Sequence, residues 1–148
     1  MKRLFDNLLG LNVSVAALLL RILIGGSFIV HGYPKLVHYS WVPRSWAQGR
    51  NRESDWLRSI GLPGGFFLFA GVVEFFGGVA VLLGVLTSIV ALLFAAWMLS
   101  TTCLSVMKVT KRYTSIGGYD VDVTLLLASL ALAIIGGGTF SIDHVLGI

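Results

Sequence analysis

Four stretches of about twenty residues, each with at most one charged side chain, constrain this chain more than any other feature of its sequence. They cover residues 13–33, 64–86, 88–107 and 121–140. A helix rises about 1.5 Å per residue, so each stretch can cross about 30 Å of hydrocarbon. A strand of a membrane barrel needs only about 9–11 residues, so these lengths favour helices. The sequence therefore predicts an all-α membrane protein, a bundle of four transmembrane helices in which residues 1–148 form a single domain.

The composition excludes an ordinary soluble domain. Hydrophobic residues make up 56% of the chain and charged residues 12%, whereas a soluble domain carries roughly 25% charge. The net charge of +4 is then interpreted as a determinant of membrane topology, and no nucleic-acid partner is expected. The single cysteine, Cys103, excludes an internal disulfide and a thiolate metal cluster, and we expect it to be buried among apolar residues.

The long link of residues 34–63 combines aromatic and basic side chains. It holds five Lys and Arg residues together with three tryptophans, Trp41, Trp46 and Trp56. Tryptophans among arginines are typical of a segment that lies in the lipid headgroup region. Within this interfacial segment the sequence predicts a short helix that starts at Ser54 or Asp55 and ends at Gly61. An irregular polar loop is the alternative.

The distribution of Lys and Arg predicts the orientation. The two long links hold eight of these residues, and the other side of the membrane holds only Lys2 and Arg3. Basic residues favour the cytoplasmic side, so both termini are expected outside, in a prokaryotic plasma membrane. The first span is interpreted as a retained helix, because it is long for a signal peptide and has Arg21 at its centre.

Two charges lie in the middle of predicted membrane helices, Arg21 in the first and Glu74 in the second. Each would cost several kcal/mol facing lipid, so each is expected to face the bundle interior and find a partner. Both are near mid-span, and small residues flank them at helical spacing, so we predict an Arg21–Glu74 ion pair. One interpretation is that the pair only locks two helices; the other is a proton or quinone-headgroup site.

The predicted topology also gathers polar residues at one membrane edge. The first helix ends and the fourth begins on the same side, which would bring His31, Lys35 and His38 towards Asp120 and Asp122. Two aspartates at i and i+2 point in different directions on a helix, so one of them is expected to join the cluster, with Asp120 favoured. The cluster is a possible quinone or anion site. The alternative is that these residues anchor helix ends by snorkelling.

Metal and haem sites are not predicted. The three histidines are His31, His38 and His144; His144 is expected on the opposite membrane face and His38 in a link, so they cannot form a bis-histidine haem site. We therefore expect the chain to bind no metal or cofactor of its own, with quinone as the one candidate.

The order of several motifs resembles the DoxX family of small four-helix membrane proteins. The run from Arg21 through His31 to Leu36 resembles the signature of that family's first helix. Residues 59–65, Glu74 with Gly77 and Gly78, and residues 82–87 resemble its second helix and the exit from it. Residues 117–120 and 136–143 resemble its closing motifs, although members often have glutamate where this chain has Asp120 and Asp122.

The resemblance implies a four-helix bundle with functional positions at Arg21, His31, Lys35, Glu74 and Asp120. Members include the large subunit of an archaeal thiosulfate:quinone oxidoreductase, and others are linked to thiol and oxidative-stress complexes. We therefore expect an accessory membrane subunit of a respiratory or other quinone-linked oxidoreductase complex, surrounded by lipid and further subunits. The alternatives are a catalytic subunit that passes electrons from a sulfur compound to quinone, and a small proton-conducting or carrier bundle.

Overall fold

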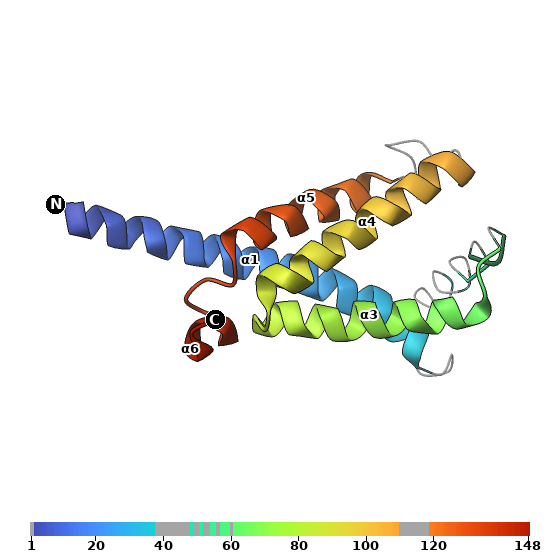
Figure 1. Cartoon of the computed structure of the whole chain (residues 1–148), viewed down its shortest axis with the longest axis horizontal. Helices are drawn as coiled ribbons and strands as arrows, with labels where there is room; N and C mark the ends of the chain where they lie inside the picture. The colour runs from blue at the N-terminus through green and yellow to red at the C-terminus, as the bar shows by residue number, and fades with distance from the viewer. Residues whose placement is uncertain are drawn as a thin grey trace. The chain divides into compact units, whose positions relative to one another are not determined.

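The computed structural model describes residues 2–37, 48, 51, 54–55, 57–59, 61–109 and 119–148. Every regular element in this part of the chain is an α-helix (Figure 1): α1 (Lys2–Leu36), α3 (Gly64–Leu83), α4 (Thr87–Val109), α5 (Asp120–Ile135) and α6 (Ile142–Leu146). The chain divides into two units. The first unit consists of Met1–Ile24 and Ala80–Ile148, and the second of Gly25–Val79.

The predicted helices are all present, with differences at their ends. α1 begins at Lys2, eleven residues before the predicted start, because the leucine-rich residues 2–12 continue the helix. α3 begins at Gly64 as predicted, and α4 lies within two residues of its prediction at both ends. α5 ends at Ile135 and not at 140, because Gly136 adopts φ 79° and starts a glycine-rich turn.

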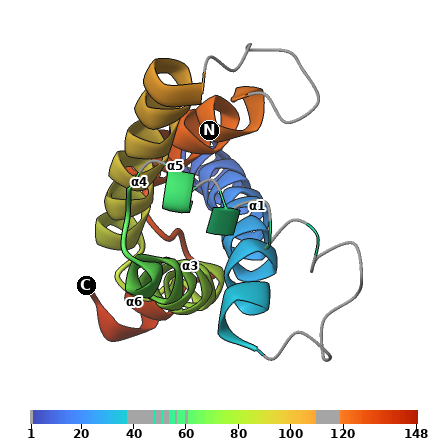
Figure 2. The same ribbon diagram turned by 90° about the vertical axis from the view of Figure 1, so that its right-hand side faces the viewer.

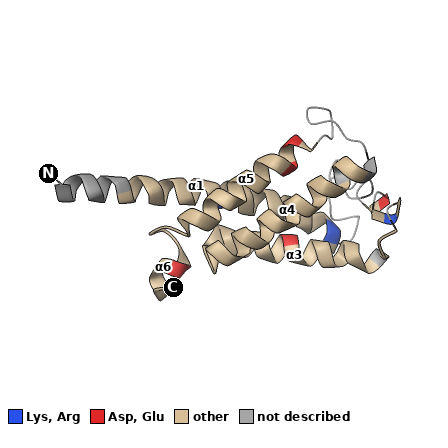
Figure 3. Ribbon diagram, turned by 45° about the horizontal axis from the view of Figure 1, so that its top comes forward, with Lys and Arg blue, Asp and Glu red and all other residues tan. Residues whose placement is uncertain are grey.

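Three of the described helices are long and apolar enough to cross a membrane: Gly10–Leu36, Gly65–Leu83 and Thr87–Leu104. Their ribbons consist almost entirely of uncharged residues (Figure 3). α5 has 16 residues, or about 24 Å of helix, somewhat less than the hydrocarbon thickness of about 30 Å. The integral-membrane character of the chain therefore rests on three spans, and the fourth crossing stays a prediction.

A three-residue turn, residues 84–86, joins α3 to α4. The spans predicted over 64–86 and 88–107 leave a still shorter link, but α3 ends at Leu83 because the chain turns at Gly84. Gly84 adopts φ 75°, the Val85 N–H donates to the Ala80 carbonyl at 2.9 Å, and the Gly84 N–H donates to the Val81 carbonyl at 3.1 Å. This pair of bonds is the Schellman motif, which satisfies carbonyls at the C-terminal end of a helix. Leu86 follows with φ 49°, a left-handed conformation that costs a non-glycine residue about 1–2 kcal/mol.

In the first unit, α4 and α5 run side by side in opposite directions (Figures 1 and 2). The buried residues of α5 are Leu125, Ser129 and Leu132, one face at helical spacing. The buried residues of α4 repeat with the same period: Thr87, Ala91, Phe94, Ala95 and Met98.

In the second unit, residues 25–36 of α1 pack closely against α3 through glycines. A Cβ on Gly78 would lie 2.9 Å from the Gly25 carbonyl oxygen, and one on Gly32 would lie 2.5 Å from the Phe75 backbone nitrogen. Real side chains do not tolerate such distances, so only glycine permits this approach. Close backbone approach through small residues is the usual way in which membrane helices pack.

Much of the predicted interfacial segment, including Trp41, Trp46 and Trp56, lies outside the described residues. The described residues of its predicted short helix, Ser54, Asp55 and 57–59, are helical. Gly61 ends it with φ 83°, and the Leu62 N–H donates to the Leu57 carbonyl at 3.1 Å. The predicted helix end at Gly61 is therefore confirmed.

Candidate functional site

A buried ion pair forms the polar centre of the second unit. The Lys35 Nζ lies 2.6 Å from the Glu74 Oε2, and each residue is only 5% exposed. We call these two residues the Lys35–Glu74 pair. Lys35 comes from the last turn of α1 and Glu74 from the middle of α3. Two charges removed from water in this way are stabilised only while they remain together.

The local sequence explains how the two side chains meet. Pro34 lies inside α1; it removes one backbone donor, but the helix continues to Leu36 and holds Lys35 on its buried face. The Lys35 Cβ faces Gly71, where an added Cβ would lie 2.7 Å away. Glu74 follows Gly71 by one helical turn, so the lysine side chain runs along α3 from the glycine to the carboxylate.

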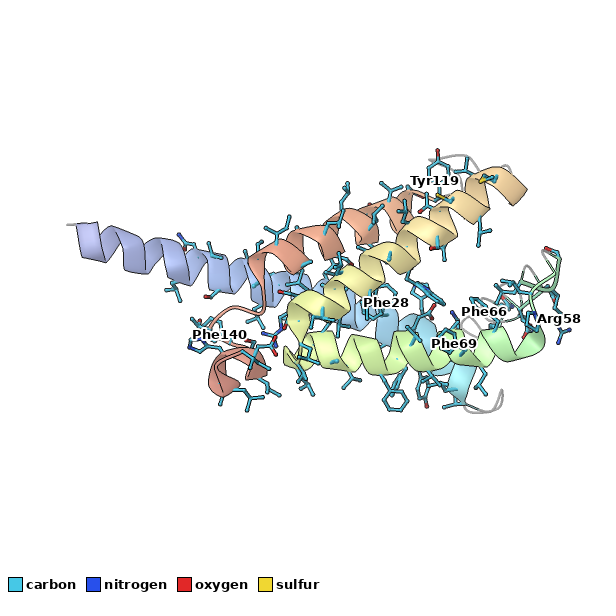
Figure 4. All side chains as sticks on the ribbon, viewed as in Figure 1. Phe28, Arg58, Phe66, Phe69, Tyr119 and Phe140 are labelled. Atoms are coloured by element: carbon cyan, nitrogen blue, oxygen red, sulfur yellow. The ribbon has the colours of Figure 1, made fainter. Side chains whose placement is uncertain are left out.

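Aromatic rings lie on the two helices that carry this pair. The Lys35 Nζ lies 5.8 Å from the centroid of the Phe67 ring, within the range of a cation–π contact. Tyr33, two residues before Lys35, and Phe75, next to Glu74, pack their rings with centroids 6.2 Å apart. Phe66 and Phe69 extend the aromatic surface along α3, with centroids 6.0 Å apart (Figure 4). The ammonium therefore lies beside one aromatic ring, and further rings lie along the same two helices.

Arg21 forms the polar centre of the first unit together with Asp143, and we call it the Arg21–Asp143 cluster. Arg21 is 2% exposed, and its guanidinium donates to four backbone carbonyls. Its Nε donates to Val81 at 3.0 Å and its Nη2 to Leu82 at 2.7 Å. Its Nη1 donates to the carbonyls of Gly137 and Phe140, at 3.2 and 2.8 Å.

These four carbonyls lie where helices end. Val81 and Leu82 are in the last turn of α3, and residues 137 and 140 are in the turn after α5. The last carbonyls of a helix lack partners inside it and carry partial negative charge, so a cation is favourable there. A Cβ on Gly84 would lie 2.8 Å from the Arg21 Cζ, so this glycine provides the space for the guanidinium.

Asp143 binds the other side of the α3–α4 turn. Its Oδ1 accepts from the Leu86 N–H at 2.6 Å and its Oδ2 from the Thr87 N–H at 2.8 Å, and its own N–H donates to the Gly84 carbonyl at 2.9 Å. The carboxylate thus caps the N-terminal end of α4, where the helix dipole favours an anion. Arg21 and Asp143 compensate opposite helix ends at one turn.

The pKa of the Asp143 carboxyl is lowered from its usual value. Burial alone raises this pKa. It is outweighed by the neighbouring Thr87 side chain, by hydrogen bonds from the amides of Thr87 and Leu86, and by the positive charge of Arg21. The Thr87 hydroxyl forms no hydrogen bond with a described residue. We therefore attribute the lowered pKa of Asp143 mainly to the two short hydrogen bonds from the Leu86 and Thr87 amides.

The predicted partners of Arg21 and Glu74 are corrected by these contacts. Both side chains are buried, as expected, but Glu74 pairs with Lys35 in the second unit and Arg21 binds carbonyls in the first. The sequence suggested a charged partner for Arg21, whereas its actual partners are backbone carbonyls. The prediction could not include the carbonyls of a helix end, because the sequence places neither the end of α3 nor the turn after α5 beside Arg21.

The remaining predicted site residues lie in different places. His31 is exposed on α1, one turn before the buried Lys35. Asp120 and Asp122 are half-buried in the first turn of α5, where acidic residues complement the helix dipole. They belong to the first unit and His31 to the second, so their clustering stays a prediction. His38 lies outside the described residues.

Two residues differ from their sequence interpretation. Cys103 is exposed on α4 and not buried, because it lies on the outward face of that helix. Asp143, which the sequence interpretation did not assign to a site, is a central buried acid; its signal was a single carboxylate within an otherwise apolar tail. Within the described ranges, no three His, Cys, Asp or Glu side chains are grouped as a metal site would require.

Comparison with known proteins places the chain among small membrane proteins. The family model described as DoxX matches residues 16–109. A Bacillus subtilis protein named "Putative oxidoreductase CatD" is 31% identical over 129 residues, covering 87% of this chain and 85% of that protein. The Escherichia coli "Inner membrane protein YqjF" is 30% identical over 132 residues, covering 89% and 92%. No solved structure matches.

Proposed function

Because the chain belongs to the DoxX family, we propose that it is an integral membrane subunit of a quinone-linked oxidoreductase complex, with an accessory and not a self-sufficient catalytic role. One similar protein carries an oxidoreductase name and another an inner-membrane name. We further propose the multi-pass arrangement with four crossings, both termini outside the prokaryotic plasma membrane, and contacts with other subunits of the complex.

The observation that carries this proposal is the Lys35–Glu74 pair. A lysine and a glutamate buried at 2.6 Å between membrane-spanning helices cost more free energy than a pair of apolar residues in the same place. Ionisable residues inside membrane spans commonly mark proton or substrate pathways. The pair therefore supports a role in proton handling beside an apolar ligand.

The residues around the pair fit the headgroup of a quinone. A quinone presents two carbonyl oxygens on a flat apolar ring, and Lys35 offers an ammonium donor beside the Phe67 ring. When bound, a quinone would supply two-electron, two-proton redox chemistry. In this role Lys35 would donate a hydrogen bond to the ligand, and Glu74 would hold the ammonium in place and accept or return a proton at its carboxylate.

One of the predicted edge residues extends this site outward. We propose that His31 connects the Lys35–Glu74 pair to water, since a buried proton carrier needs a polar path to the membrane surface. His31 is exposed one turn from Lys35, which supports an entry point at that end of α1. The proposed site thus combines the Phe67 ring beside Lys35 with His31 as a polar exit for protons.

Gentle purification tests this proposal directly. The full chain would be isolated from its native membrane in mild detergent, its quinone content measured after solvent extraction, and the co-purifying chains identified. We expect bound quinone and further oxidoreductase subunits. Lys35→Met combined with Glu74→Leu removes both charges without leaving one buried alone, and should lower the quinone content several-fold while the subunits still co-purify. Arg58→Met, at an exposed position, serves as the matched control.

The result also separates the accessory role from the catalytic alternative. An accessory subunit should reduce no quinone when it is isolated from its partners and supplied with thiosulfate or another sulfur donor. Reduction by the isolated chain would instead support the catalytic subunit. Absence of quinone from the parent protein and from its complex would contradict the quinone-linked proposal as a whole.

A further inference from the structure

The C-terminal segment presents apolar side chains outward and keeps its acid inside. Val145 is 82% exposed, Leu146 63% and Ile148 72%, and Phe140 in the preceding turn is 52% exposed (Figure 4). Asp143 is 8% exposed and binds the α3–α4 turn. Exposing these apolar side chains to water is unfavourable, so the segment is expected to contact lipid or another protein.

The contacts of Asp143 fix α6 at the level of that turn. Three hydrogen bonds of 2.6 to 2.9 Å join Asp143 to Gly84, Leu86 and Thr87. The turn lies between the spans Gly65–Leu83 and Thr87–Leu104. Two successive spans can be joined by three residues only at a surface of the membrane. All these groups belong to the first unit, so α6 lies at the same surface.

We propose that α6 and the preceding turn lie in the lipid interface, with Phe140, Val145, Leu146 and Ile148 in contact with acyl chains. Short segments with an apolar outward face bind at the boundary between headgroups and acyl chains. Asp143 then fastens this lipid-contacting segment to the α3–α4 turn.

The polar groups of the segment support lipid as the occupant. The Ser141 hydroxyl accepts from the His144 N–H at 3.1 Å and donates to the Gly138 carbonyl at 2.6 Å. Gly147 and Ile148 donate to the carbonyls of His144 and Asp143, at 3.3 and 3.0 Å. The Arg21 guanidinium donates hydrogen bonds to the Gly137 and Phe140 carbonyls of the preceding turn. Backbone that is satisfied inside the protein is tolerated near lipid.

Site-directed fluorescence tests the lipid contact. In a Cys103→Ser background, Val145→Cys and Leu146→Cys would each carry an environment-sensitive fluorophore, with His144→Cys as the matched neighbour on α6. The full-length protein would be reconstituted into vesicles of phosphatidylcholine and phosphatidylglycerol. We expect a blue-shifted emission at 145 and 146, quenched several-fold more strongly by spin-labelled lipids than by aqueous iodide, with the reverse preference at 144.

Two results would overturn the proposal. Stronger quenching by iodide than by lipid at both 145 and 146 would show that α6 lies in water. Protection from both quenchers would show that protein, either a second copy or another subunit, covers the segment. The labelled proteins need not bind quinone, so neither result depends on the proposed function.

Discussion

The Lys35–Glu74 pair gives the sharpest test of the physical reasoning, through a double-mutant cycle. Lys35→Met and Glu74→Leu each leave one charge buried without its partner, and the two changes combined remove both charges. At 2.6 Å and an effective dielectric constant of about 20, the attraction between the charges is about 6 kcal/mol. Desolvation offsets much of this attraction, so the net contribution of the pair is small.

The magnitudes follow from that balance. Each single change should destabilise the protein by about 3–5 kcal/mol, because the remaining charge is still buried and has lost its counter-ion. The double apolar change should cost less than either single change, within about 1.5 kcal/mol of the parent protein. The interaction energy from the cycle should therefore be at least as large as one of the single effects.

Reversible unfolding in mixed micelles, with increasing dodecyl sulfate followed by circular dichroism, measures these differences. Asp55→Asn and Arg58→Met provide a matched control, since both residues are exposed and should change stability by no more than about 0.5 kcal/mol. Single changes below about 1 kcal/mol, or a double change equal to the sum of the two single changes, would refute the description of a desolvated pair.

Three further predictions use the same unfolding assay. Gly32→Ala should destabilise by about 1–3 kcal/mol, because its Cβ would lie 2.5 Å from the Phe75 nitrogen; Gly26→Ala, with nothing within 4 Å, should stabilise by about 0.5–1 kcal/mol. Arg21→Lys should cost about 3 kcal/mol or more, since one ammonium cannot reach four carbonyls. The parent should have a higher free energy of unfolding than Asp143→Asn, by an amount that is constant above about pH 5 and shrinks below about pH 4.

The sign of the pH effect follows from the pKa of Asp143, which is lowered in the folded state. The ionised carboxylate stabilises the fold fully above the unfolded pKa of about 3.9, and this contribution is lost as the pH falls through the folded pKa. A difference between parent and variant that grows on acidification would contradict this assignment. Equal effects of Gly32→Ala and Gly26→Ala would contradict the close helix approach, and a neutral Arg21→Lys would contradict the role of the forked guanidinium.

Local patterns along the chain were sufficient for the existence of the helices and for the burial of Arg21 and Glu74, but not for every helix end or for the exposed Cys103. Length and the lack of charge predicted the spans, because a helix that crosses hydrocarbon needs about twenty apolar residues. The same patterns placed Arg21 and Glu74 inside the protein, because a charge facing lipid is costly. Gly61 predicted a helix end, and the minimal link between the second and third spans predicted a tight turn. The structure contains both, with left-handed glycines at Gly61 and Gly84.

Only the tertiary structure decided which polar groups meet. Lys35 reaches Glu74 because glycines let α1 and α3 approach within the second unit, and Arg21 binds carbonyls because two helix ends converge on it in the first. Asp143 joins residues more than fifty positions away along the chain. A charge in an apolar sequence shows that a partner must exist, since burial without one is unstable. It does not identify that partner, because backbone carbonyls and amides are present at every residue and only the fold determines which of them remain unsatisfied.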